Sequence, residues 1–187
     1  MDNSILEAVK VLKEGGLILY PTDTIWGIGC DATNEKAVAK VYALKQREDS
    51  KALVMLAADL DMVARYVQEI PQMAIQLVEV NDAPMTIIYP GATGLAPNAI
   101  AEDGSVGIRI PLAGSCIDLV KRFGRLLVST SANISGEPTP HKFADIPDVI
   151  KSAVDFIVEP SLEAGATGQS SQIIKVGLDG EIQIIRG

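Results

Sequence analysis

The chain has 187 residues, a length typical of one domain, and its 48% hydrophobic and 21% charged residues match an ordinary globular protein. Its formal net charge of −8 argues against a protein held to nucleic acid or to an anionic membrane by bulk charge, because phosphate contacts need Lys and Arg. A small basic cavity inside an acidic surface remains compatible with this charge. The apolar runs are far shorter than the ~18 residues of a membrane span, and the first residues have no signal-peptide pattern, so we expect a cytoplasmic protein without a membrane partner.

The helices expected in chain order follow from apolar residues at helical spacing, such as Ile5, Val9 and Leu12. They are expected over 4–14, 35–46, 59–67, a segment that begins near 71, 117–123 and part of 143–154. Asn3 or Ser4 can cap the first helix, and Asp59 can cap the third.

The strands are expected between these helices, over 17–20, 52–57, 85–89, 105–110, 126–129, 156–159, 172–176 and 181–185. The last two flank Leu178–Gly180, which predicts a closing hairpin. An antiparallel hairpin within an α/β alternation predicts a mixed sheet with flanking helices. The chain shows no internal repeat or linker, so we expect a single domain over 1–187.

The stretch Tyr20–Ala32 is crowded with hydroxyls, one early carboxylate and two glycines, and it contains the only tryptophan. This composition favours a loop whose backbone approaches a ligand, because glycine allows close approach and short hydroxyls can donate. An ordinary strand-to-helix connection explains the same residues as turn chemistry. Gly27-x-Gly29-x-x-Ala32 resembles a dinucleotide fingerprint, but residues 21–26 separate it from the preceding strand, so we discount it.

The sequence offers few candidate residues for a metal site or for catalysis by a histidine. Cys30 and Cys116 have no zinc-like spacing and are expected to be buried reduced thiols. The single histidine, His141, lies in a proline-rich stretch and is expected in a solvated loop. Ser–His catalysis needs a positioned imidazole, so general acid–base work is expected to fall on carboxylates or on the substrate.

Cations occur where strands begin or end. Lys45, Arg47 and Lys51 fall at a helix end just before a buried strand. They can offset the helix dipole, or they can bind a polyphosphate. Arg109 alternates with the apolar residues of its strand, beside Gly107, which favours a site over a solvated face.

Hydroxyl-rich turns add to this pattern at 129–136 and 168–172, and Arg186 follows the last strand. Such turns are also common without a function. Cations and hydroxyls that recur at strand ends suit a nucleotide site in which positioning and charge neutralisation carry the catalysis.

Taken together, these stretches resemble the YrdC/TsaC family of threonylcarbamoyl-AMP synthases. The matching segments are Tyr20–Thr24 with Gly27 and Gly29, Leu44–Arg47 with Lys51, Pro84–Thr86, Ile108–Arg109, Ser129–Asn133 with Ser135–Gly136, and Ser171. The resemblance implies a twisted mixed α/β sheet around a large, positively lined cavity. It implies synthesis of L-threonylcarbamoyladenylate and pyrophosphate from ATP, L-threonine and bicarbonate. Partner enzymes would then transfer the threonylcarbamoyl group to adenosine in tRNA.

The resemblance also implies roles for individual residues, residue by residue. The implied catalytic cations are Lys45, Arg47 and Lys51. Contacts to threonine or its carbamoyl group are implied for Thr22, Thr24, Arg109 and Ser171. Nucleotide contacts are implied for Arg47, Lys51, Thr86, Ser131, Asn133 and Arg186. Mg²⁺ would be carried by the triphosphate, with no metal site built by the protein.

The chain departs from the family pattern at three places. Asn81–Ala83 stands where members often have Trp-Pro-Gly, which can loosen one wall of the cavity, and Glu48 stands where many have proline. No histidine lies near 55–56, which indicates the shorter, single-domain branch. Two alternatives stay open: an RNA-binding or ribosome-maturation factor on the same fold, and a paralogue with a different acceptor. The net charge of −8 disfavours the first and makes direct tRNA binding weak or indirect.

Overall fold

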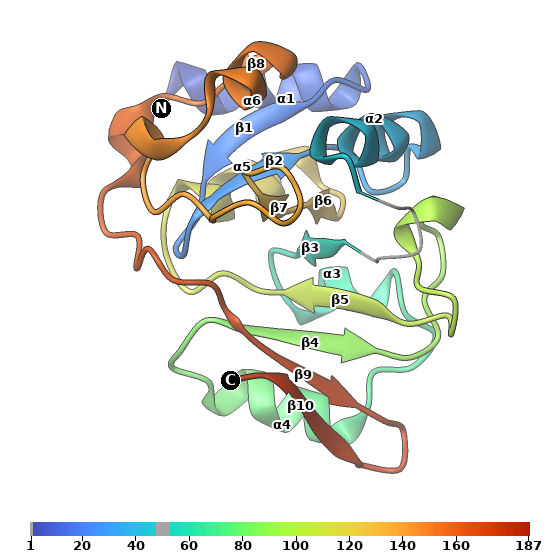
Figure 1. Cartoon of the computed structure of the whole chain (residues 1–187). Helices are drawn as coiled ribbons and strands as arrows, with labels where there is room; N and C mark the ends of the chain where they lie inside the picture. Colours follow the sequence, from blue (N-terminus) through green and yellow to red (C-terminus); the bar gives the residue numbers. More distant parts are fainter. Residues whose placement is uncertain (1, 48–52) are drawn as a thin grey trace.

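The computed structural model describes residues 2–47 and 53–187 and has the expected α/β architecture, with the strands in two mixed sheets (Figure 1). The helices are α1 (Asn3–Lys13), α2 (Glu35–Lys45), α3 (Leu60–Ala64), α4 (Gln72–Val80), α5 (Ser115–Phe123) and α6 (Asp148–Ala153), with 3₁₀ turns at Pro97–Ala99, Phe143–Asp145 and Pro160–Glu163. The strands are β1 (Ile18–Pro21), β2 (Trp26–Gly29), β3 (Val54–Leu56), β4 (Met85–Tyr89), β5 (Val106–Arg109), β6 (Leu127–Val128), β7 (Thr130–Ser131), β8 (Phe156–Ile157), β9 (Gln172–Val176) and β10 (Ile182–Arg186).

The smaller sheet has the strand order β7-β2-β1-β8 and corrects the expectation of a loop over 20–32. β1 and β2 form an antiparallel hairpin instead. The Tyr20 side chain leaves room only for glycine at position 29, because a Cβ there would lie 2.6 Å from Cε1 of Tyr20. Gly27 and Gly29 lie within β2, which confirms that they do not form a dinucleotide fingerprint.

The larger sheet has the order β10-β9-β4-β5-β3-β6. The pairs β3–β5 and β4–β9 are parallel, and the remaining pairs are antiparallel. Met55, Ile87 and Ile108 are fully or almost fully buried in its centre. The closing hairpin is confirmed, since β9 pairs with β10 across residues 177–181.

The two sheets meet where β6 leads into β7. Leu127–Val128 pairs with β3 of the larger sheet, and Thr130–Ser131 pairs with β2 of the smaller one, so Ser129 lies at the passage between them. The Tyr20 hydroxyl donates to the Val128 carbonyl at 3.1 Å and links β1 to this passage. Figure 1 shows β1 and β2 above β3, β5 and β4.

Helix ends are decided by local hydrogen bonds. Asp59 caps α3 as predicted, accepting from the Met62 N–H at 2.8 Å. The first helix is capped by Asp2 rather than by Asn3 or Ser4, because the Asp2 carboxylate accepts from the Ser4 N–H at 2.9 Å. The third helix ends at Ala64, earlier than the predicted end at 67.

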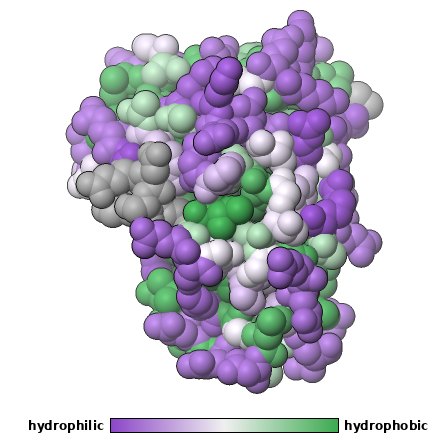
Figure 2. Space-filling model, turned by 90° about the vertical axis from the view of Figure 1, so that its right-hand side faces the viewer, coloured by the Kyte–Doolittle hydropathy of each residue, from purple (hydrophilic) through white to green (hydrophobic). Residues whose placement is uncertain are grey.

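The face drawn in Figure 2 is largely purple and therefore hydrophilic, with hydrophobic residues in green near its centre. Both cysteines are buried and free, and His141 is exposed, as predicted. Over the described ranges, the structure contains no helix long and apolar enough to cross a membrane.

Candidate functional site

A cavity of about 260 Å³ lies where the two sheets face each other. Its wall combines the β1–β2 turn, β7, the ends of β5 and β10, and the segment that leads into β9. The lining residues are Thr22, Thr24, Ile25, Trp26, Gly27, Arg47, Val54, Arg109, Ser129, Thr130, Ser131, Thr139, Ser170, Ser171, Ile173 and Arg186. Three guanidinium groups and many hydroxyls therefore line one concave site of the kind that binds small ligands.

The β1–β2 turn is held by the hydroxyl of Thr22. This hydroxyl donates to the Ile25 carbonyl at 2.7 Å and accepts from the N–H groups of Thr24 and Ile25 at 3.1 and 3.2 Å. Such local side-chain bonds stabilise a tight turn. The Thr22 hydroxyl is thus occupied within the turn, and the hydroxyl of Thr24, 3.0 Å away, is the one beside Arg109.

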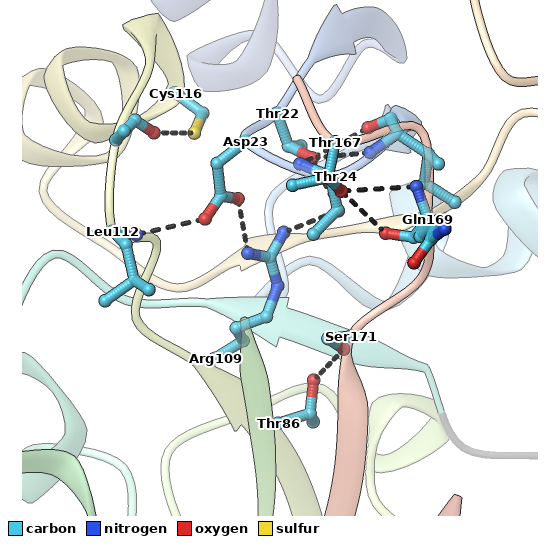
Figure 3. Close-up of polar contacts among 12 residues, drawn as sticks. Thr22, Asp23, Thr24, Thr86, Arg109, Leu112, Cys116, Thr167, Gln169 and Ser171 are labelled. Carbon is cyan, nitrogen blue, oxygen red and sulfur yellow. Dashed lines mark hydrogen bonds and ion pairs between the residues drawn. The ribbon is translucent and has the colours of Figure 1, made fainter. Parts of the chain in front are cut away.

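Arg109 reaches from β5 to this turn across the cavity (Figure 3). Its Nη1 forms an ion pair with Asp23, and its Nη2 donates to the Thr24 hydroxyl at 3.3 Å. The second Asp23 oxygen accepts from the Leu112 N–H at 3.0 Å. Arg109 is only 3% exposed and lines the cavity, so it does not face bulk solvent, and its role in a site stays a prediction.

The start of β9 forms the opposite wall. The Ser171 hydroxyl lies 2.8 Å from the Thr86 hydroxyl, and the Ser171 carbonyl accepts from Nε and Nη2 of Arg186 at 3.0 and 2.7 Å. Ser171 and Arg186 line the cavity, whereas Thr86 is fully buried behind Ser171. Partial burial lowers the pKa of Arg186.

Lys45 is placed differently from the expectation that it faces a phosphate. It is 2% exposed, and its Nζ donates to the carbonyls of Ser131 and Asn133 at 2.6 and 2.9 Å and to the Asn133 amide oxygen at 3.1 Å. Burial, and then the nearby charge of Arg47, lower its pKa from 10.5 to about 8. Lys45 therefore holds the loop that carries Ser131 and is not part of the lining.

Of the other two predicted cations, Arg47 and Lys51, the structure describes only Arg47. Arg47 lines the cavity two residues beyond the end of α2, and burial lowers its pKa. Lys51 lies outside the described residues, as does Glu48. Asn133 is buried behind Ser131, whose hydroxyl donates to the Asn133 amide oxygen at 2.6 Å.

Sequence reasoning missed Trp26 as a lining residue. Its indole Nε1 donates to the Glu163 carboxylate at 2.6 Å, and its ring centroid lies 5.0 Å from that of Phe143. Glu163 also accepts from the Phe143 N–H at 2.8 Å. The position of the only tryptophan inside the stretch 20–32 was the one available signal.

The sequence indicated the hydroxyl-rich turn at 168–172, but it did not indicate that the segment 163–171 crosses the β1–β2 turn. The Thr167 N–H donates to the Asp23 carbonyl at 3.0 Å, and the Gly168 N–H donates to the Thr24 carbonyl at 2.8 Å. This crossing brings Ser170 and Ser171 to the cavity. Asn81–Ala83, where the chain departs from the family pattern, is not part of the described lining.

The arrangement suits the binding of an anionic ligand. Arg47, Arg109 and Arg186 supply the charge, and backbone and hydroxyl groups supply donors. The lining described above contains no carboxylate or imidazole, and the described residues hold no group of three or more His, Cys, Asp or Glu placed to bind a metal ion.

Comparison with known proteins places these features in a family. The Sua5/YciO/YrdC family model, described as "Telomere recombination", matches residues 10–187. A threonylcarbamoyl-AMP synthase of Chromohalobacter salexigens is 33% identical over 154 residues, 82% of this chain and 83% of that protein. One of Acinetobacter baumannii is 30% identical over 186 residues, 96% of each chain.

Solved structures agree with this assignment. Sua5 of P. abyssi complexed with L-threonine matches with a TM-score of 0.81 and 26% identity, over 92% of this chain and 50% of that one, so the chain spans about half the length of that protein. YciO of E. coli has the same fold, with a TM-score of 0.82 and 24% identity over 97% of this chain and 87% of that one. Since the family model covers nearly the whole sequence, the chain belongs to the Sua5/YciO/YrdC family.

Proposed function

We propose that this protein is a threonylcarbamoyl-AMP synthase. It uses ATP, L-threonine and bicarbonate to make L-threonylcarbamoyladenylate with release of pyrophosphate, the first step of threonylcarbamoyladenosine modification of tRNA. The observation that carries the proposal is the cavity into which Arg47, Arg109 and Arg186 converge among hydroxyls. It occurs in a chain 30% identical, over 96% of its length, to a relative of that name.

The chemistry fits a site without a catalytic imidazole. Bicarbonate loses hydroxide to give CO₂, the threonine amine adds to CO₂ to form a carbamate, and the proton lost by the amine combines with the hydroxide to give water. A carbamate oxygen then attacks the α-phosphate of ATP, so that a new P–O bond forms as the bond to pyrophosphate breaks. The nucleophile is already anionic, and the main task of the protein is to hold it in line and to neutralise charge on the phosphates.

Six of the lining residues have a proposed contact with a substrate. Arg47 and Arg186 neutralise the phosphates, and Ser131 contacts the nucleotide. Thr24, Arg109 and Ser171 contact the threonine or its carbamoyl group. The remaining predicted residues act through these contacts: Thr22 shapes the turn, Thr86 supports Ser171, and Lys45 and Asn133 support Ser131. For Lys51, a contact with a phosphate of ATP stays a prediction.

In the proposal, Mg²⁺ reaches the site bound to ATP. Magnesium is bound in proteins through carboxylates and phosphate oxygens. Because the described lining offers hydroxyls and guanidinium groups rather than carboxylates, the ion would be carried by the triphosphate. It would neutralise phosphate charge when bound.

The product is a reactive mixed anhydride that needs an acceptor enzyme. We propose that threonylcarbamoyl-transferring partner enzymes receive it in the cytoplasm. The acidic net charge supports a contact with tRNA that is weak or indirect.

The test is pyrophosphate release from ATP and Mg²⁺, with L-threonine and bicarbonate each left out in turn. We expect release only when both are present. Pyrophosphate release that requires bicarbonate, together with an amine other than L-threonine, would establish the paralogue with a different acceptor. No release in any mixture would refute the synthase proposal.

Arg47→Ala tests the assigned site. We expect kcat/KM to fall by about 10²–10³, the size of effect seen when one preorganised charge donor is removed. Arg122→Ala is the matched control, because Arg122 is an exposed arginine on α5 outside the lining. An unchanged rate in Arg47→Ala would refute the assignment of this arginine.

A further inference from the structure

The buried carboxylate of Asp23 has no assigned task, although it lies beside the cavity. Resting on the proposed function, we propose that Asp23 is a positioning residue that fixes the Arg109 guanidinium and cancels its charge, so that this part of the cavity accepts the zwitterionic amino acid and rejects phosphate. Asp23 would thus set which substrate binds where.

Both carboxylate oxygens of Asp23 have a protein partner. One carboxylate oxygen pairs with Nη1 of Arg109, and the other accepts from the Leu112 N–H at 3.0 Å. Its backbone carbonyl accepts from the Thr167 N–H at 3.0 Å. Asp23 is not among the lining residues, whereas its partner Arg109 is, so the side chain of Asp23 is placed to act on a ligand through Arg109.

Arg109 is correspondingly fixed in one orientation. Its guanidinium is held at Nη1 by Asp23 and at Nη2 by the Thr24 hydroxyl, and the residue is 3% exposed (Figure 3). A planar guanidinium held in this way presents its remaining donors in a fixed direction. It can therefore recognise a carboxylate without further ordering.

The charge at Arg109 differs from that at Arg186. The Asp23–Arg109 pair is neutral as a unit, whereas Arg186 donates to the uncharged Ser171 carbonyl. L-Threonine, before its amine becomes a carbamate, is neutral overall and is compatible with a neutral pair. A polyphosphate with several negative charges is favoured where cationic charge is left uncompensated. Arg109 is thus suited to bind threonine, and Arg186 is suited to bind the phosphates of ATP.

Asp23→Asn keeps the size of the side chain and removes its charge. The amide has one carbonyl oxygen in place of the two acceptors that face Arg109 and Leu112, so one of these two contacts is lost and the guanidinium loses its charged partner. With wild-type enzyme that shows threonine-dependent pyrophosphate release, we expect the KM for L-threonine to rise about tenfold. The KM for ATP should change less than threefold, and inorganic phosphate should become an inhibitor competitive with threonine.

Asp31→Asn is the matched control. Asp31 is also buried, at 3% exposure, and also accepts from an arginine, Arg125, at 2.7 Å, but Arg125, unlike Arg109, is not part of the lining. We expect it to lower the melting temperature without separating the two KM values. In the Arg109→Gln background, Asp23→Asn should add no further rise in the KM for threonine, since it acts through Arg109.

Three outcomes would overturn the inference. They are an unchanged KM for threonine in folded Asp23→Asn, equal rises in both KM values, and additive effects with Arg109→Gln. If Asp23→Asn does not fold, Asp23→Glu keeps the charge and should remain insensitive to phosphate, and phosphate inhibition there would overturn it. If the wild type shows no threonine dependence, the proposed function fails separately. The inference is then read from phosphate binding followed by Trp26 fluorescence, which must tighten in Asp23→Asn.

Discussion

At the scale of the residue, Lys45 is a buried cation that does not line the cavity but holds the loop that carries the lining residue Ser131. Its ammonium group donates to Ser131 and Asn133, and it ties the end of α2 to the loop after β7. The Ser135 N–H also donates to the Lys45 carbonyl at 2.9 Å. Replacing this lysine leaves the acceptors of Ser131 and Asn133 without its ammonium donor, and those of Asn133 are buried away from solvent.

Lys45→Met is therefore expected to lower the free energy of unfolding by about 3 kcal/mol, within the range for breaking a buried polar network. The looser Ser131 loop should also raise the KM for ATP. Denaturant unfolding and steady-state kinetics measure the two effects. A variant as stable as the wild type would show that these bonds contribute little.

The pH dependence of stability carries a separate prediction for Lys45. Burial lowers its pKa from 10.5 to about 8 in the folded protein, so the unfolded chain binds more protons between these values. Stability then rises with pH through this window. Between pH 7.5 and 9.5, the free energy of unfolding of the wild type should gain on the order of 2 kcal/mol relative to Lys45→Met. A constant difference would contradict the lowered pKa.

At the scale of the element, the β1–β2 hairpin depends on a close approach. The Tyr20 ring packs over Gly29 and donates its hydroxyl to β6. Nothing in β2 itself requires glycine by backbone conformation, since Gly29 does not have a positive φ. The requirement comes from the neighbouring strand.

Gly29→Ala is expected to destabilise the protein by about 1–3 kcal/mol, because the new Cβ would lie 2.6 Å from the Tyr20 ring. Gly107→Ala in β5 is the matched control. There the nearest atom, Cγ2 of Thr86, lies 3.4 Å from the new Cβ, an ordinary contact. Thermal unfolding of both variants measures the difference. Equal melting temperatures would show that the hairpin can shift to accommodate a methyl group.

At the scale of the whole molecule, an acidic surface encloses a cavity lined by arginines. This separation of charge bears on the RNA-binding alternative. We expect no saturable tRNA binding at micromolar concentrations near 150 mM salt, and only a shallow dependence on salt, because few phosphates can be neutralised at once. Filter binding across a salt series measures this. Tight binding with a steep slope would favour the RNA-binding reading over the synthase.

Local patterns were sufficient for many elements of the fold. Both β4 and β9 have the bounds expected from the sequence, and Asp59 caps α3 as predicted. These features depend on residues close along the chain, through side-chain periodicity and short hydrogen bonds. Arg109 was found in the same way, because strand alternation places it on the face opposite its apolar neighbours.

The sequence alone therefore determined the α/β class, most element positions and the residue types of a candidate anion site. Only the tertiary structure decided that the strands form two sheets, that Lys45 lies behind the cavity, and that Asp23 pairs with Arg109, 86 residues away. Each of these depends on partners that are distant along the chain. A side chain's periodicity shows which face it occupies, but the group it meets there is determined by how the sheets pack.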